Sequence, residues 1–317
     1  MIQLLSQHSI QINKEFKNYI SKAAETLYLS NEIKSYACEV FRIYTPMKER
    51  SFLLYMIAYA YDIESDKIIP YALGVEMIFA SYYAKDDIID SVSKSDFAKQ
   101  ILICDFLNEQ GHILINNQSA IVESFSNLVK GQFLSECFES ISEMINIEPT
   151  FIPYYKAGSL FESMIDIFKP FMQNNYSSDL FLLKEISRDI GTWLQIKNDI
   201  QDFLINTNIE EENLRLRKKR ALEDLLQGKY NYVLAMGARN SKMTNILNRY
   251  WKSNLDVTDD LQDYIFSILE EENIISNCIL QLENTRTKIT HKAKLLNNRF
   301  IIKEITKYEE EILQMYN

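Results

Sequence analysis

Residues 71–90, with the sequence YALGVEMIFASYYAKDDIID, form a largely apolar stretch that ends in three aspartates. A helix with apolar side chains over most of its surface is typical of the interior of a bundle. Asp86 and Asp90 are four residues apart, so they share one face of this helix, with Asp87 beside them. Three adjacent carboxylates repel one another, and Mg²⁺ would relieve the repulsion by binding them together with phosphate oxygens of a substrate. The stretch therefore predicts an interior helix that carries a Mg²⁺ site.

Helix breakers are rare in the rest of the chain as well. The 317 residues include only 7 Gly and 5 Pro, and Pro170 is the last proline. This composition favours long helices, and the alternation of apolar and polar residues that is typical of strands is missing from the sequence. We therefore predict an all-α fold with a single domain over residues 1–317. The expected helices span residues 51–62, 71–90, 97–117, 119–146, 150–176, 179–206, 219–240, 240–253, 259–272 and 275–316.

Composition excludes several functional classes. The formal net charge of −10 argues against binding to nucleic acid, whose phosphates require a basic surface. The four cysteines are scattered without a CxxC pair, so neither a zinc site nor a disulfide framework is expected. The polar N-terminus does not resemble a secretory signal, and no apolar run reaches the ~18 residues that a membrane span requires. We expect a cytoplasmic protein, which can still bind an anionic substrate through metal ions.

A second acidic cluster lies in the sequence QIKNDIQD, which runs from Gln195 to Asp202. Asp199 and Asp202 are three residues apart and lie on the same side of a helix, while Gln195 and Asn198 add neutral oxygen and amide groups nearby. More than a hundred residues separate this cluster from Asp86. We expect two helices that face each other across a cavity, each with its own carboxylates.

A third segment, DDLQD from Asp259 to Asp263, repeats the spacing of the first cluster but has a different context. Thr258 precedes it and can cap a helix, and acidic residues in a first turn complement the helix dipole. The segment also lacks the apolar approach that leads to Asp86. We interpret it as a helix start and not as a metal site.

These motifs resemble those of the trans-isoprenyl diphosphate synthases, also called polyprenyl synthetases. The family's first motif, DDxxD, is matched by the aspartates at 86, 87 and 90, and its second, QIxDDxxD, is matched except that Asn198 replaces the first Asp. The other similar segments follow in the family's order between about residues 40 and 240. They are Glu76-Met-Ile, Gly131-Gln132, Lys156-Ala-Gly-Ser-Leu-Phe161 and Gly228-Lys229.

The resemblance implies a bundle of antiparallel helices around a deep cavity, usually in a homodimer. It implies Mg²⁺ ions that are held by the two aspartate motifs and bridge to the diphosphate of an allylic prenyl substrate. Lys156 and Lys229 would contact the same diphosphate, and Gln195 and Asn198 would lie beside it. Bulky residues just before the first motif limit product length in the family, which is one role for Tyr82 and Tyr83. Packing within the bundle is the other.

The chemistry of such a substrate agrees with these residue types. Breaking an allylic C–O bond leaves a carbocation and inorganic diphosphate. The departing negative charge requires metal ions and lysines. The carbocation requires an apolar pocket with little water, so that it is not quenched early.

The chain departs from the family where a second diphosphate, that of isopentenyl diphosphate, usually binds. In the family's Gly-Gly-Lys-x-x-Arg segment, Arg50 matches the Arg, Met47 replaces the Lys, and Lys48 could substitute for it. Phe79 replaces a His, and residues 91–97 lack the usual Arg pair. Each charge-assisted contact is worth about 1.5–3 kcal/mol, so three lost contacts would weaken binding roughly a thousandfold or more.

Several functions remain open from the sequence. The lost cations favour a terpene synthase, or a prenyltransferase with a non-standard acceptor. The second motif remains like that of the synthases, which keeps a short-chain isoprenyl diphosphate synthase of the geranyl, farnesyl or geranylgeranyl type as the alternative. A non-catalytic partner subunit is disfavoured, because such a subunit has no need for both carboxylate clusters. A binding module without metal or diphosphate has little support.

Overall fold

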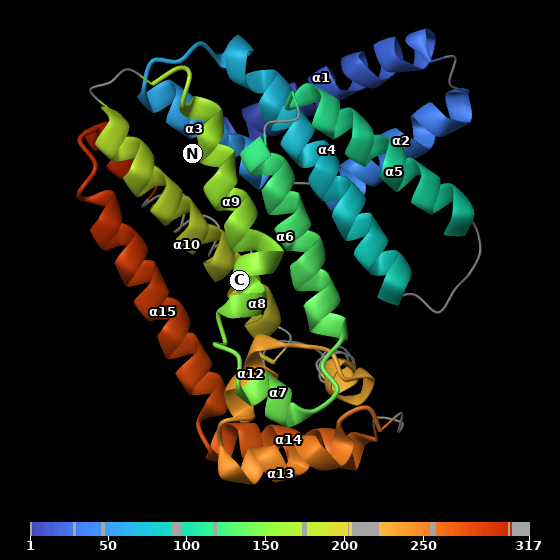
Figure 1. Ribbon diagram of the computed structural model, residues 1–317, viewed down its shortest axis with the longest axis vertical. Helices are drawn as coiled ribbons and strands as arrows, with labels where there is room; N and C mark the ends of the chain where they lie inside the picture. Colours follow the sequence, from blue (N-terminus) through green and yellow to red (C-terminus); the bar gives the residue numbers. More distant parts are fainter. Residues whose placement is uncertain are drawn as a thin grey trace. The chain divides into compact units, whose positions relative to one another are not determined.

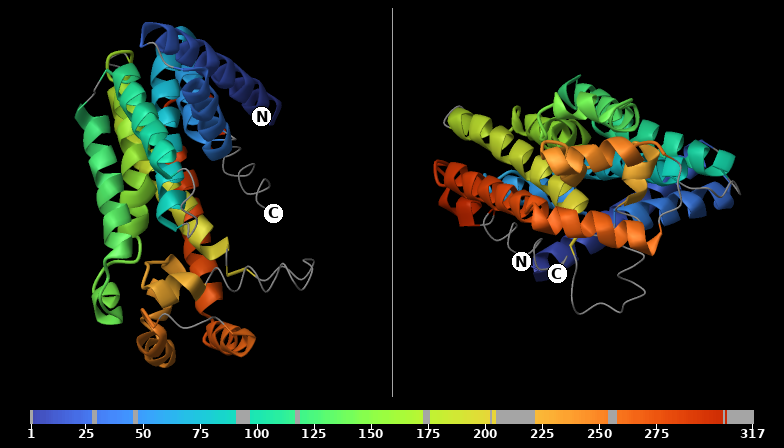
Figure 2. Two further views of the ribbon diagram at one scale, coloured as in Figure 1. Left: turned by 90° about the vertical axis from the view of Figure 1, so that its right-hand side faces the viewer. Right: turned by 90° about the horizontal axis from the view of Figure 1, so that it is seen from below.

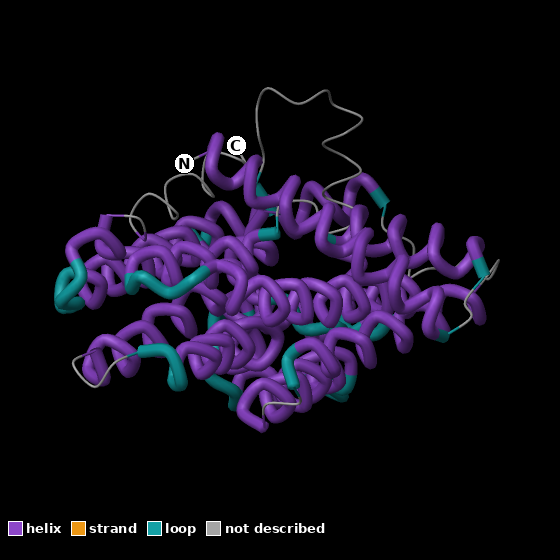
Figure 3. Tube along the Cα trace, turned by 90° about the horizontal axis from the view of Figure 1, so that it is seen from above, coloured by secondary structure: helices purple, strands orange, loops and turns teal. Residues whose placement is uncertain are grey.

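The computed structural model describes residues 2–27, 30–45, 48–90, 97–116, 119–172, 176–201, 203–204, 222–253, 258–303 and 305. These residues form helices and loops and no strand, which confirms the all-α prediction (Figure 3). None of the described helices combines the length and apolar character that crossing a membrane requires.

The chain divides into two compact units. Unit 1 comprises residues 1–122, 167–180 and 296–317, and unit 2 comprises residues 123–166 and 181–295. The organisation as a single domain over residues 1–317 stays a prediction.

Helix α4, Ser65–Asp90, forms the centre of unit 1 and contains the stretch with which the sequence analysis began. Five consecutive residues of α4, Met77 to Ser81, are buried, as expected for a helix surrounded by protein. It packs against each of the other long helices of this unit, and α4 and α5 lie side by side (Figure 1). These helices are α1 Ile2–Thr26, α2 Asn31–Tyr44, α3 Glu49–Ala60 and α5 Phe97–Leu114.

Unit 2 contains the second aspartate motif on helix α10, Ser177–Gln201. Helix α15 is joined to α10 by an ion pair between Lys292 and Asp189 at 2.6 Å. α14 packs against both α13 and α15 (Figure 2). The other helices that lie wholly or mostly in this unit are α6 Ser119–Glu136, α7 Ile141–Ile145, α8 Phe151–Pro153, α9 Ser159–Met164, α12 Tyr232–Gly237, α13 Ser241–Tyr250, α14 Asp259–Glu271 and α15 Ile274–Ala293.

Four of the predicted helices are interrupted. The helix expected over 119–146 ends at Glu136 and resumes as α7, and the one expected over 275–316 ends at Ala293. Residues 299–303 are helical again because Asn298 Oδ1 accepts hydrogen bonds from the two backbone N–H groups of Phe300 and Ile301. The apolar periodicity of the sequence predicted one continuous helix here and did not indicate this cap.

The other two interruptions lie next to predicted site residues. The helix expected over 150–176 contains a π-helical turn, η1, at Tyr154–Gly158, and ends in a 3₁₀ turn, η2, at Ile165–Phe168. The helix expected over 219–240 is broken at Gly228, whose φ of +75° is a left-handed conformation that glycine adopts without steric cost. By contrast, the helix start at Thr258 is confirmed, because its Oγ1 accepts a hydrogen bond from the backbone N–H of Leu261 at 3.3 Å.

Candidate active site

The first aspartate motif occupies the last turns of α4 in unit 1. Asp86 is half-buried and Asp87 is exposed, while the side chain of Asp90 lies outside the described part. The hydroxyl of Tyr44, the last residue of α2, donates a hydrogen bond to Asp87 Oδ2 at 2.8 Å. The described side chains include no group of three His, Cys, Asp or Glu residues arranged to hold a metal ion.

Aromatic side chains occupy the two turns of α4 before Asp86. Phe79 is buried and its ring centroid lies 5.6 Å from that of Tyr83. Tyr82 is half-buried, and burial raises the pKa of its hydroxyl to about 12. Because residues 79, 82 or 83, and 86 recur every three to four positions, this aromatic surface shares a helix face with Asp86.

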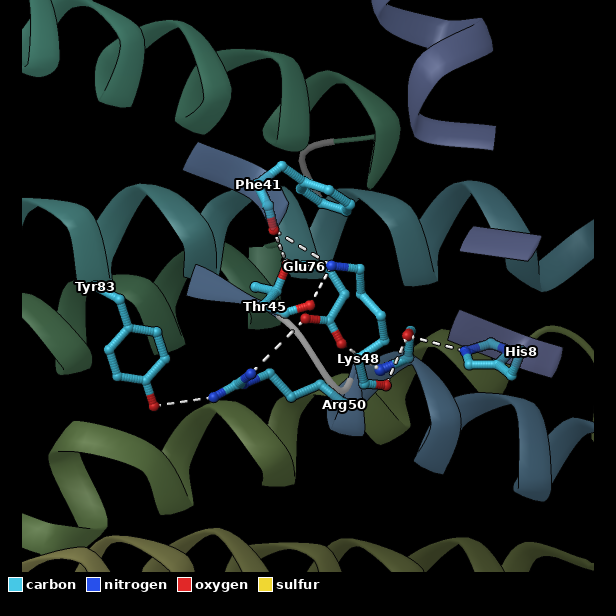
Figure 4. A network of polar contacts seen from close by, with 8 residues as sticks. His8, Phe41, Thr45, Lys48, Arg50, Glu76 and Tyr83 are labelled. Carbon is cyan, nitrogen blue, oxygen red and sulfur yellow. Dashed lines mark hydrogen bonds and ion pairs between the residues drawn. The ribbon is translucent and has the colours of Figure 1, made fainter. Parts of the chain in front are cut away.

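Arg50, at the start of α3, contacts Phe79, Tyr83 and one carboxylate, and Figure 4 shows it with Tyr83 and Glu76. Its guanidinium lies 3.5 Å from the centroid of the Phe79 ring, and its Nη2 donates a hydrogen bond to the hydroxyl of Tyr83 at 2.9 Å. Nη1 lies 3.7 Å from Oε2 of the buried Glu76, whose Oε1 accepts a hydrogen bond from the backbone N–H of Ser51. Arg50 is 7% exposed and therefore has partners inside unit 1.

Lys48 is also turned into unit 1 (Figure 4). Only 1% of its surface is exposed, and its ammonium donates hydrogen bonds to the backbone carbonyls of Phe41 and Thr45 and to Thr45 Oγ1. The ammonium also lies 3.9 Å from the centroid of the Phe41 ring. Burial lowers the pKa of Lys48 to about 8, although nearby Glu76 acts in the opposite direction. Met47 and residues 91–96, which also belong to the altered diphosphate site, lie outside the described residues.

The second aspartate motif lies at the end of α10 in unit 2. Asp199 is half-buried, and its Oδ1 accepts a hydrogen bond from Gln195 Nε2 at 3.0 Å. Its Oδ2 accepts one from the backbone N–H of Tyr232, at the start of α12, at 2.9 Å. Asn198 is exposed, and Asp202 lies outside the described residues. Gln195 and α12 thus fix the orientation of the Asp199 carboxylate.

Sequence reasoning missed Asp224, which lies close to three of the predicted site residues in unit 2. Burial raises the pKa of its carboxyl to about 7, and the negative charge of Asp199 acts in the same direction. A hydrogen bond from Asn231 and the positive charges of Lys156 and Lys229 oppose this rise. The signal that would have identified Asp224 is its place in the helical segment 222–227, directly before Gly228-Lys229.

Lys229 is positioned by the left-handed turn at Gly228 and by the end of α6. Its Nζ lies 3.5 Å from Glu136 Oε2, and the two side chains are 15% and 28% exposed. The next residue, Tyr230, donates its backbone N–H to the carbonyl of Ser135 at 2.7 Å. Glu136 is therefore a second acidic residue of this site that the sequence analysis did not identify.

Lys156 lies in the π-helical turn η1, a rare structure that often marks a functional site. It is half-buried. A Cβ atom on Gly158 would overlap Thr192 Oγ1 of α10, so glycine at this position allows η1 to approach α10 closely. The close approach places Lys156 and Asp199 in one region of unit 2, beside Asp224.

Comparison with known proteins identifies the family. Residues 47–268, more than two thirds of the chain, match the polyprenyl synthetases. The chain belongs to the polyprenyl synthetase family. No curated protein matches this synthetase in sequence.

Solved structures of three synthases share its fold. Geranylgeranyl pyrophosphate synthase from Lactobacillus brevis has a TM-score of 0.77 at 14% identity, over 98% of this chain and 99% of that one. Decaprenyl diphosphate synthase from Rhodobacter capsulatus has a TM-score of 0.76 at 12% identity, over 99% and 98%. Heptaprenyl diphosphate synthase from Staphylococcus aureus has a TM-score of 0.73 at 16% identity, over 96% and 97%. The isoprenoid synthase fold and the assignment as a prenyltransferase enzyme, both expected from the sequence, are confirmed.

Proposed function

We propose that this polyprenyl synthetase ionises an allylic prenyl diphosphate with Mg²⁺ and directs the carbocation to something other than isopentenyl diphosphate. That acceptor is either the substrate's own double bonds, as in a terpene synthase, or another molecule. The observation that carries the proposal is the burial of Lys48 and Arg50, the two cations at the place of the family's second diphosphate site. A diphosphate would have to displace their internal partners before it could bind them.

The residues of the donor side fit a hard divalent cation. Mg²⁺ prefers carboxylate oxygens, and each unit offers proposed ligands of its own, from the aspartate motif at residues 86–90 in unit 1 and from Asp199 and Asp202 in unit 2. Burial raises the pKa of Asp224, and the negative charge of Asp199 adds to this rise, so a cation bound beside Asp199 would offset that second effect. When bound, Mg²⁺ would neutralise the charge that develops on the departing diphosphate.

The side chains of the donor site have separate roles in this proposal. Lys156 and Lys229 bind the diphosphate oxygens, and Lys229 exchanges Glu136 for the substrate. Gln195 orients Asp199, and the exposed Asn198 lies at the edge of the substrate site. The aromatic face formed by Phe79, Tyr82 and Tyr83 excludes water from the carbocation and limits the length of the chain that fits.

The second candidate function is a short-chain synthase that condenses the allylic substrate with isopentenyl diphosphate. The observation in its favour is the family itself, together with neighbours that make geranylgeranyl, heptaprenyl and decaprenyl diphosphates. It requires that Arg50 leave Glu76 and the Phe79 ring when the second diphosphate arrives.

We further propose that the protein is a homodimer in the cytoplasm. Val129 and Phe133, one turn apart on α6, are 49% and 65% exposed, and Leu102 and Ile113 share a face of α5 with 67% and 53% exposure. Apolar faces of this kind favour contact with a second copy. Sedimentation equilibrium of the wild type and of Phe133→Lys would test it, with a shift to monomer expected for the variant.

Product analysis tests the proposed acceptor. The enzyme is incubated with C10, C15 and C20 allylic diphosphates and Mg²⁺, with and without isopentenyl diphosphate. We expect release of inorganic diphosphate from one of the three substrates at a rate that isopentenyl diphosphate barely raises. Efficient formation of longer prenyl diphosphates would instead establish the second candidate.

Two matched aspartate variants test the metal site. Asp86→Ala removes a proposed ligand and is expected to lower turnover roughly a thousandfold, which corresponds to about 4 kcal/mol. Asp260→Ala removes an exposed aspartate with the same DDxxD spacing at the start of α14 and is expected to retain full turnover. If Asp86→Ala kept the same turnover as Asp260→Ala, Asp86 would not be a ligand of the metal.

A further inference from the structure

The contact between Tyr44 and Asp87 joins α2 to the last turns of α4. Asp87 is exposed, and the Tyr44 hydroxyl donates a hydrogen bond to its Oδ2 at 2.8 Å. The middle aspartate of the first motif thus has a protein partner of its own.

Packing around this contact is loose. A cavity of about 200 Å³ lies among α2, α4 and α5, and its walls include Tyr44 together with Ala84 and Ile88 of α4. Side chains that line a cavity lack partner atoms on one side and are held less firmly by packing. Polar contacts therefore contribute more to fixing α4 here. They are the hydrogen bond from Tyr44 and, towards α5, an ion pair between Lys85 and Asp105 at 2.7 Å.

The turns that are held in this way also carry Asp86. Helix ends open locally more easily than helix interiors, and α4 ends at Asp90. The hydrogen bond from Tyr44 to Asp87 limits local opening in the turn that contains Asp86. It also holds the carboxylate of Asp87 on the side of α2, because an oxygen that accepts from Tyr44 is directed towards that helix.

We propose that Tyr44 is a positioning residue for the first aspartate motif, and that Asp87 is its anchor and not a ligand of the metal. Tyr44 holds Asp87 towards α2 and keeps the turn of Asp86 in the conformation that binds the ion. The inference rests on the proposed metal site and adds to it a residue outside the aspartate motif, Tyr44.

Binding of Mn²⁺ in the presence of inorganic diphosphate, measured by electron paramagnetic resonance, tests the inference without turnover. Tyr44→Phe keeps the ring and removes the hydroxyl, and is expected to weaken Mn²⁺ binding about tenfold, the size of effect that groups behind metal ligands have. Tyr36→Phe is the matched control, since Tyr36 lines the same cavity about 12 Å earlier along α2. Its Mn²⁺ binding is expected to equal that of the wild type.

Asp87→Asn separates an anchor from a ligand. The asparagine oxygen can still accept the hydrogen bond from Tyr44, so this variant should bind Mn²⁺ within about threefold of the wild type. Hydrogen exchange of the amides of residues 84–90 should be faster in Tyr44→Phe and unchanged in Asp87→Asn. Wild-type Mn²⁺ binding in Tyr44→Phe, or a greater loss in Asp87→Asn than in Tyr44→Phe, would overturn the inference.

Asp86→Ala distinguishes failure of the inference from failure of the proposed metal site. If Asp86→Ala loses Mn²⁺ binding while Tyr44→Phe keeps it, the site stands and the role of Tyr44 is wrong. If Asp86→Ala keeps Mn²⁺ binding, the proposed metal site itself is wrong and the inference is lost with it.

Discussion

Each of the two units holds a pair of cations that the family resemblance assigns to a diphosphate, but the pairs have different surroundings. In unit 1, Lys48 and Arg50 are 1% and 7% exposed, and their partners are carbonyls, aromatic rings and Glu76. In unit 2, Lys156 is half-buried and the Lys229 side chain is 15% exposed, and both lie near carboxylates at the edge of solvent. A lysine or arginine near a family motif therefore does not establish a binding role until its partners are known.

The two pairs differ in the free energy needed to separate each cation from its carboxylate partner. Glu136 is 28% exposed and can release Lys229 into water or to a substrate at little cost. Glu76 is fully buried, so its separation from Arg50 would leave an uncompensated charge inside the protein. The following predictions test this contrast.

Removing the buried carboxylate should have the largest effect. Glu76→Ala leaves Arg50 buried without its ion pair and the backbone N–H of Ser51 without its acceptor, and is expected to cost about 3–5 kcal/mol of unfolding free energy. Glu136→Ala, the matched change in unit 2, should cost less than about 1 kcal/mol. Urea denaturation measures both. Similar losses in the two variants would contradict the contrast.

Neutralising one lysine in each unit should affect the reaction unequally. Lys229→Met removes a charge-assisted contact to the diphosphate worth about 1.5–3 kcal/mol, so kcat/KM for the allylic substrate should fall about 10- to 150-fold. Lys48→Met should leave kcat/KM within about threefold, because this ammonium is already bound by the carbonyls of α2 and Thr45. Steady-state release of diphosphate measures kcat/KM for both variants. A larger loss of kcat/KM in Lys48→Met would show that Lys48 contacts the substrate.

Acid should destabilise unit 1 through His8. Burial lowers the pKa of this histidine to about 4 from 6.5. The unfolded chain binds a proton on His8 at higher pH than the folded chain does. The stability that depends on a neutral His8 is therefore fully present above pH 6.5 and is lost as the pH falls towards 4. The loss of unfolding free energy is at most about 3 kcal/mol. His8→Gln should lose less stability over this range. Parallel curves of stability against pH for the two proteins would disprove the assignment.

The Asp224 carboxyl of unit 2 should act over nearly the same pH range in the opposite direction. Because the pKa of Asp224 is raised to about 7 from 3.8, the unfolded chain loses this proton first, and the metal-free protein loses stability as the pH rises from about 4 to 7. Asp224→Asn removes the titrating group. The difference in unfolding free energy between variant and wild type should therefore grow in favour of the variant over this range.

Releasing Lys229 should have the smallest effect. Glu136→Gln removes the carboxylate at 3.5 Å from Lys229 Nζ, and the affinity for inorganic diphosphate should rise about two- to fivefold at low salt. Glu123→Gln changes the net charge equally on the exposed side of α6 and serves as the control. Calorimetric titration compares them, and an equal gain in both variants would show that only net charge matters.

The sequence by itself determined the features that depend on local order. An apolar run identified α4, Thr258 and the acidic turn after it identified the start of α14, and the spacing of the aspartates indicated the family. These signals are readable because side chains three to four positions apart lie on the same face of a helix. Breaks that depend on single turns, such as the cap at Asn298 and the left-handed Gly228, were missed because they do not alter the apolar period.

Only the tertiary structure decided which charged residues are already satisfied. The partners of Arg50 and Asp87 lie 33 and 43 residues away in the chain, at Tyr83 and Tyr44. Asp224 joins Asp199 and Lys156 only because α10, η1 and the segment 222–227 pack together in unit 2. The strength of a charge depends on burial and on neighbours within a few ångströms, and neither quantity can be calculated from the order of the residues.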